Sequence, residues 1–96
     1  MTGVIWSEKS LRDLRRIDHW LTENAGRDVA IRALAAIRNR VVRLTEFPRI
    51  GRSVPENRTR ALRAMGTPYL VLYQVNDDRI DILRIRHERE DWQVST

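Results

Sequence analysis

Few side chains in this chain could carry acid–base or metal chemistry. Its 96 residues include two histidines, His19 and His87, and no cysteine. Such a set supplies neither a thiolate zinc site nor an all-histidine one, so we expect no metal and no cofactor. His87 is the better candidate for acid–base work, although a strand-end histidine beside acidic residues more often has a structural, hydrogen-bonded role. His19 adjoins an apolar helical stripe, which favours a role in helix packing.

Arginine is the other chemically informative residue. The net charge is +5, and 17 arginines stand against a single lysine, Lys9. Guanidinium groups pair bidentately with carboxylate or phosphate, so we expect an anionic partner: nucleic acid, an anionic surface or an acidic protein segment. The charge is therefore also consistent with a different class of protein, a small basic module that binds nucleic acid.

Three runs near the end of the sequence predict a β-meander, which would position Arg60, Arg63, Arg84 and Arg86. The runs begin at Arg60, Tyr69 and Ile80, and two tight turns separate them. The middle run is apolar at nearly every position, so it should be covered on both faces. The last run breaks strict alternation, which indicates either two partly covered faces or a β-bulge near Ile82.

Two helices are predicted before the meander. A short strand at residues 4–6 precedes Ser7, a good N-cap for a helix over about residues 8–23. Gly26 can end that helix, and Asp28 is a candidate cap for a second helix that stops before Pro48. The loop between them is short, so the helices should pack antiparallel. We expect Trp20 in the core and a helix seam made by Ala30, Leu34, Ile37, Val41 and Leu44.

A connection of about a dozen residues, 46–58, joins the second helix to the meander. Phe47, Ile50 and Val54 are expected to anchor it as an ordered loop, with proline and glycine shaping its turns. The whole chain, 1–96, is long enough for one domain and too short for two. It has no apolar run near the ~20 residues that cross a bilayer and no signal peptide, so we expect a cytoplasmic protein without a membrane partner.

The order of these elements, together with several local motifs, resembles the RelE/ParE superfamily of toxins from prokaryotic toxin–antitoxin pairs. The motifs are the run 47–52 (Phe-Pro-Arg-Ile-Gly-Arg), the Pro-Glu at 55–56 and the run 69–73 (Tyr-Leu-Val-Leu-Tyr) before an acidic turn. The resemblance covers nearly the whole chain. It implies an α+β fold of order β-α-α-β-β-β, with an antiparallel two-helix hairpin on one face of a small, mostly antiparallel sheet. It also implies a cognate antitoxin.

The resemblance implies one of two activities. RelE-like toxins cleave mRNA on the ribosome, whereas ParE-like toxins are associated with inhibition of DNA gyrase. In the nuclease reading, Arg63 and His87 would be the catalytic residues. Leu70, however, stands where nucleases carry an arginine after the aromatic residue, and Trp92 cannot replace a terminal tyrosine hydroxyl. Lys9, at the start of the first helix, cannot replace the lysines of several nucleases either. These departures favour a ParE-like gyrase inhibitor, with the ribosome-dependent endonuclease as the alternative.

Interpretation of the chain as a toxin also predicts which surfaces bind the antitoxin and the target. The helical arginines expected to bind the antitoxin are Arg12, Arg16, Arg38 and Arg43. The basic surface expected to face the target is formed by Arg60, Arg63, Arg84, Arg86 and Arg89. A homodimer or a toxin–antitoxin heterotetramer would be compatible with such surfaces.

Overall fold

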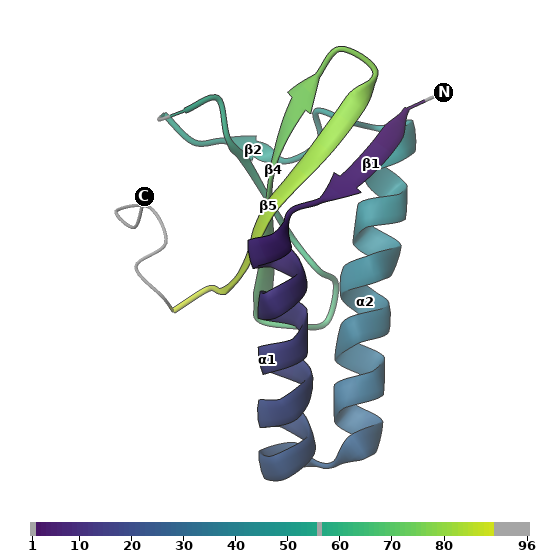
Figure 1. Ribbon diagram of the computed structural model, residues 1–96, viewed down its shortest axis with the longest axis vertical. Helices are drawn as coiled ribbons and strands as arrows, with labels where there is room; N and C mark the ends of the chain where they lie inside the picture. Colours follow the sequence, from purple (N-terminus) through teal and green to yellow (C-terminus); the bar gives the residue numbers. More distant parts are fainter. Residues whose placement is uncertain (1, 56, 90–96) are drawn as a thin grey trace.

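A computed structural model describes residues 2–55 and 57–89. A two-helix hairpin packs on one face of a five-stranded sheet with strand order β1-β5-β4-β3-β2 (Figure 1). The elements are β1 (Gly3–Trp6), α1 (Glu8–Ala25), α2 (Arg27–Glu46), β2 (Arg52–Ser53), β3 (Arg60–Arg63), β4 (Tyr69–Asn76) and β5 (Arg79–His87). Only the β1–β5 pair is parallel. The predicted α+β fold is confirmed, and β2 adds a two-residue strand inside the expected loop.

Ser7 joins β1 to α1 as the predicted N-cap. Its Oγ accepts a hydrogen bond from the N–H of Ser10 at 2.9 Å. The same hydroxyl donates to the carbonyl of Leu83 at 2.8 Å, and the N–H of Ser7 donates to the carbonyl of Ile82 at 3.0 Å. The cap therefore also fixes the start of α1 against β5.

Gly26 alone makes the turn between the helices. Its φ of +100° is a conformation that glycine adopts without steric cost, and its N–H donates to the carbonyl of Leu21 at 2.9 Å. The expected cap at Asp28 is wrong, because α2 already begins at Arg27 and has no side-chain cap. Asp28 instead lies in the first turn, where a carboxylate suits the positive end of the helix dipole.

The main core lies between the hairpin and the sheet. Four of the five predicted seam residues are buried, but Leu34 is only partly buried and Ala33 takes its place. The difference arises because the helices bury the side that faces both the partner helix and the sheet. Trp20 is also not a core residue: 58 % of it is exposed.

Of the two explanations left open for the broken alternation of β5, the structure has the β-bulge. Leu72 pairs with Arg84 and Tyr73 pairs with Ile82, so Leu83 is the extra residue. The extra residue shifts the alternation by one, and Ile80, Ile82 and Ile85 all become buried under the helices. A single strand can thus present an apolar side to the core across an irregular sequence pattern.

The second face of the sheet carries a small apolar cluster of its own, formed by Val54, Ala61, Leu70 and Leu72. Because the main core contains Tyr69, Val71 and Tyr73, β4 is covered on both faces, as predicted. Of the three apolar residues expected to anchor the connection before β3, only Val54 is buried. Phe47 and Ile50 are exposed.

Candidate functional site

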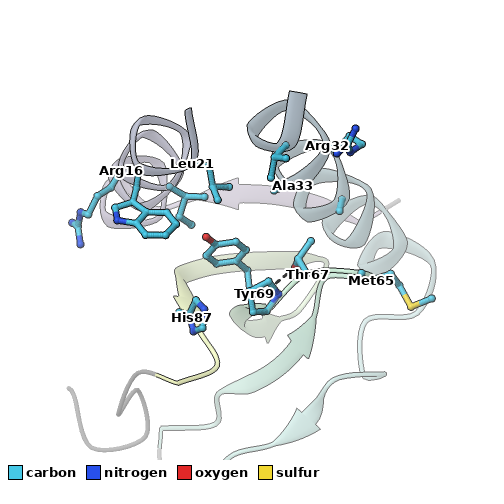
Figure 2. Close-up of a pocket in the computed structure, with 14 residues that line it drawn as sticks. Arg16, Leu21, Arg32, Ala33, Met65, Thr67, Tyr69 and His87 are labelled. Carbon is cyan, nitrogen blue, oxygen red and sulfur yellow. Dashed lines mark hydrogen bonds between the residues drawn. The ribbon is translucent and has the colours of Figure 1, made fainter. Parts of the chain in front are cut away.

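A groove of about 770 Å³ lies between the helical hairpin and the β3–β4 turn. We call it the wedge groove. Figure 2 shows the two helices above it, Tyr69 and Thr67 beneath them, and His87 to one side. Its apolar lining includes Ile17, Leu21, Ala33, Ala36 and Tyr69. The end of α1 and the start of α2 extend past the strands of the sheet (Figure 1), and residues of both helices line the groove there.

Two large apolar side chains stand exposed at this groove. Trp20 of α1 is 58 % exposed and Met65 of the β3–β4 turn is 71 % exposed. Exposed apolar side chains that gather around a hollow are typical of protein-binding sites. Little in the sequence indicates that these two side chains lie at one groove, since Trp20 lies beside an ordinary helical stripe and Met65 lies in a turn.

Arginines flank the apolar surface on both helices. Arg16 belongs to α1 and Arg32 to α2, and Figure 2 shows them on the outer sides of the two helices. Arg16 contacts a carboxylate oxygen of Asp13 at 3.8 Å. An apolar groove between two guanidinium groups suits an amphipathic segment with acidic residues along its edges.

His87 lines this groove from the end of β5. Its register partner is Tyr69, and the two rings meet edge to face with centroids 5.6 Å apart and planes at 84°. Nδ1 of His87 accepts a hydrogen bond from the N–H of Arg89 at 3.1 Å. The histidine therefore lies on the helix-covered side of the sheet, packed against a core tyrosine.

Arg63 lies on the opposite side of the sheet. Its register partner is Leu70, a member of the small second cluster, and it forms an ion pair with Glu88. Arg86 also pairs with Leu70 in register, so two arginines flank that leucine. The fold consequently does not bring Arg63 and His87 together on one face.

The other arginines of the predicted target-facing set are spread over different surroundings. Arg60 pairs in register with Tyr73 and donates from one nitrogen to the carbonyls of Arg49, at 3.3 Å, and Gly51, at 2.9 Å. Arg89 is exposed beyond the end of β5. These contacts engage the guanidinium of Arg60 with the backbone of the α2–β2 connection.

Arg84 is bound to α1 by Asp13, a buried carboxylate that sequence reasoning missed. Oδ1 and Oδ2 of Asp13 accept hydrogen bonds from Arg84 at 3.0 and 2.8 Å. A sequence signal existed, because Ser10, Asp13 and Ile17 recur at spacings of three and four and thus share one helical face.

The arginines expected to contact an antitoxin occupy different parts of the hairpin. Arg12 lies 3.7 Å from Glu8 and Arg43 lies 3.8 Å from Glu46, with the Arg43 guanidinium also 5.1 Å from the centre of the Phe47 ring. Arg38 lines a second, outer groove between the helices. Of these four arginines, only Arg16 lines the wedge groove.

Within the described residues, no group of three metal-ligating side chains is close enough to hold an ion. The helices there are also too short or too polar to cross a membrane.

Comparison with known families decides what kind of protein this is. The sequence model of the family described as "ParE toxin of type II toxin-antitoxin system, parDE" matches residues 4–92. The chain belongs to the ParE toxin family. It is 37 % identical over 85 residues to the toxin ParE3 of Caulobacter vibrioides, covering 88 % of this chain and 85 % of that one. The resemblance to the RelE/ParE superfamily is thereby confirmed.

Solved structures of toxin–antitoxin systems share the fold. The chromosomal ParDE system from P. aeruginosa superimposes with a TM-score of 0.78 at 26 % identity, over 91 % of this chain and 96 % of that one. The RelBE2 toxin–antitoxin complex from Mycobacterium tuberculosis gives a TM-score of 0.67 at 26 % identity, over 90 % and 96 % of the two chains. This ParE-family toxin therefore has the fold of proteins whose solved forms include toxin–antitoxin complexes.

Proposed function

We propose that this ParE-family toxin stops growth by docking on DNA gyrase, and that a cognate antitoxin neutralises it by occupying the wedge groove. One observation carries the choice of a docking mechanism over nuclease chemistry. Arg63 and His87, the residues that a RelE-like reaction would need, lie on opposite faces of the sheet. A proton-transfer group must lie within hydrogen-bond reach of the atom it serves, and a phosphate-binding cation must lie beside it.

Leu70 supports the same choice. It occupies the position between Arg63 and Arg86 and is buried in the second apolar cluster. A leucine there adds packing but no positive charge for a phosphate. The surface around it presents guanidinium groups at the margins of an apolar patch, a composition that suits contact with a protein.

The antitoxin proposal rests on the shape and charge of the wedge groove. Trp20 and Met65 provide exposed apolar area, and Arg16 and Arg32 provide positive charge on either side. An acidic amphipathic helix would bury the apolar residues and pair with the arginines. Arg12, Arg38 and Arg43 extend the positive charge over the hairpin and stay in the proposed antitoxin site. A toxin–antitoxin heterotetramer or a toxin homodimer, acting in the cytoplasm, remains the expected assembly.

Purified components test the gyrase target. The toxin should inhibit supercoiling by gyrase, and addition of antitoxin should restore it, while mRNA on translating ribosomes stays intact. Cleavage of ribosome-bound mRNA with unaffected supercoiling would establish the RelE-like endonuclease instead. Toxicity with neither effect would reject both targets.

A further inference from the structure

The connection between α2 and β2 exposes an apolar and basic surface far from the wedge groove. Phe47 is 48 % exposed and Ile50 is 44 % exposed. Arg49 and Arg52 are exposed beside them. We call these four residues the connection surface. Residues 47–53 contain both arginines and no acidic residue.

Hydrogen bonds to Tyr73 and Arg60 hold the backbone of this segment in place. The N–H of Gly51 donates to the hydroxyl of Tyr73 at 2.9 Å, and the carbonyl of Gly51 accepts from Arg60 at 2.9 Å. Arg60 also donates to the carbonyl of Arg49 at 3.3 Å, and the N–H of Ile50 donates to the carbonyl of Phe47 at 3.3 Å. A Cβ on residue 51 would lie 2.6 Å from the Tyr73 hydroxyl oxygen, so glycine is required there.

These contacts turn polar backbone groups inward and leave the side chains of the connection surface outside. A short segment held in this way loses little conformational entropy when a partner binds, and preorganisation of that kind strengthens binding. Aromatic, aliphatic and arginine side chains are the usual anchors of protein interfaces. The local excess of positive charge calls for a partner that carries carboxylates.

The connection surface is separate from the wedge groove, and it meets the proposed antitoxin site only at Arg43, whose guanidinium lies 5.1 Å from the centre of the Phe47 ring. Ala36 is the last residue of α2 that lines the wedge groove, and Phe47 follows 11 positions later in the sequence. At about 1.5 Å per helical residue the two sites are about 16 Å apart along the axis. Two separate apolar and basic sites can serve two different partners.

We propose that the connection surface docks on the toxin's cellular target, through an acidic protein face with a recess for Phe47 or Ile50. The inference rests on the proposed function, because it assumes that the toxin acts by contact with a protein. The apolar pair favours a protein over nucleic acid, since phosphates would engage the arginines and leave Phe47 and Ile50 in water.

Two double variants of the intact toxin test this proposal. Arg49→Glu with Arg52→Glu reverses the charge, and Phe47→Ser with Ile50→Ser removes the apolar anchors. Arg15→Glu with Arg27→Glu is the matched charge-reversal control on exposed helical positions. For each protein we would measure the toxin expression needed to stop growth, supercoiling by gyrase, antitoxin affinity by calorimetry, thermal melting, and binding to a 30-base-pair duplex.

Both test variants should fold, bind antitoxin within about twofold of wild type and need about tenfold or more expression to stop growth. The control should stop growth at the wild-type expression level, because Arg15 and Arg27 line the outer groove beside Arg38 and not the connection surface. Unchanged growth arrest in both test variants would overturn the proposal, and so would a parallel loss of antitoxin affinity. Loss of duplex binding together with growth arrest would point to nucleic acid and also overturn it. If wild type stops growth without affecting gyrase, the gyrase target fails, and growth arrest in the variants still decides the connection surface.

Discussion

Asp13 of α1 and Arg84 of β5 form a bidentate ion pair across the interface between hairpin and sheet. The two hydrogen bonds measure 2.8 and 3.0 Å, and the N–H of Ile85 donates to the same carboxylate at 2.9 Å. Asp13 is 3 % exposed, and these donors, together with Arg16 at 3.8 Å, compensate its buried charge. The pair fixes α1 to the part of β5 that β1 does not reach.

Removal of this carboxylate should destabilise the fold strongly. Asp13→Ala leaves Arg84 and the N–H of Ile85 without their acceptor, and loss of one partner of a buried pair costs about 3–5 kcal/mol. Urea unfolding followed by circular dichroism would measure the change. The exposed Asp18→Ala on the same helix should change stability by less than about 0.5 kcal/mol. Equal midpoints for the two variants would show that Asp13 is not a stabilising contact.

Truncation of Ile37 and of Leu34 to alanine should lower the stability of the fold by different amounts, because the two side chains differ in burial. Ile37→Ala should destabilise by about 2–5 kcal/mol, because Ile37 is fully buried and its loss leaves a cavity. Leu34→Ala should cost less, about 1–2 kcal/mol, because Leu34 is only partly buried and water can fill the space. Thermal melting of both variants provides the measurement. A larger loss at Leu34 would contradict the packing described for α2.

His87 separates the two toxin activities. His87→Ala should remain toxic, and the loss of its ring contact with Tyr69 should lower stability by only about 1 kcal/mol. A nuclease that used this histidine as acid or base would lose about 100-fold in mRNA cleavage while staying folded. RNA mapping on translating ribosomes, beside a gyrase supercoiling assay, distinguishes these results. A folded His87→Ala protein without toxicity would favour the nuclease.

Charge reversal can locate the antitoxin site on the hairpin. Arg16→Glu should weaken antitoxin binding by about tenfold or more, because Arg16 lines the wedge groove. Arg38→Glu and Arg43→Glu should weaken it less, since Arg38 lines the outer groove and Arg43 contacts Glu46 and Phe47. Calorimetry with purified antitoxin measures each affinity. If Arg38→Glu has the largest effect, the antitoxin lies on the outer face of the hairpin.

Ionisation of Tyr73 should make the stability of the fold depend on pH in the alkaline range. Burial raises the pKa of its phenol above 10.0, although its hydrogen bond with Gly51 and the nearby charge of Arg60 act in the opposite direction. Above pH 10.0 the unfolded chain loses this proton while the folded chain retains it, so the contribution of Tyr73 to stability should decline as pH rises. Tyr73→Phe should cost about 1–2 kcal/mol at pH 7, because the Gly51 N–H loses its acceptor.

Urea unfolding between about pH 8 and pH 11 tests this assignment, since that range spans the ordinary titration of tyrosine. Stability of the wild type should fall more steeply above pH 10.0 than that of Tyr73→Phe. Parallel curves for the two proteins would exclude Tyr73 as the source of the alkaline dependence.

The sequence alone was sufficient for the order of the elements, apart from the two-residue strand β2, which was expected to be loop. Ser7, the helical stripes and the turn at Gly26 are local signals, and each acts through residues a few positions away. The bulge was also visible as a break in the alternation of β5. These features could be predicted because hydrogen bonding and apolar periodicity operate over short stretches of chain.

Tertiary structure decided what the arginines and apolar residues do. The sequence alone predicts Arg84 to be a surface residue, whereas in the folded protein it binds Asp13, which is 71 positions away. Trp20, Phe47 and Ile50 were all expected to be buried, and the structure leaves each of them exposed. The placement of Arg63 and His87 on opposite faces follows from strand register. Such relations join distant parts of the chain through packing, so they exist only once the whole domain has folded.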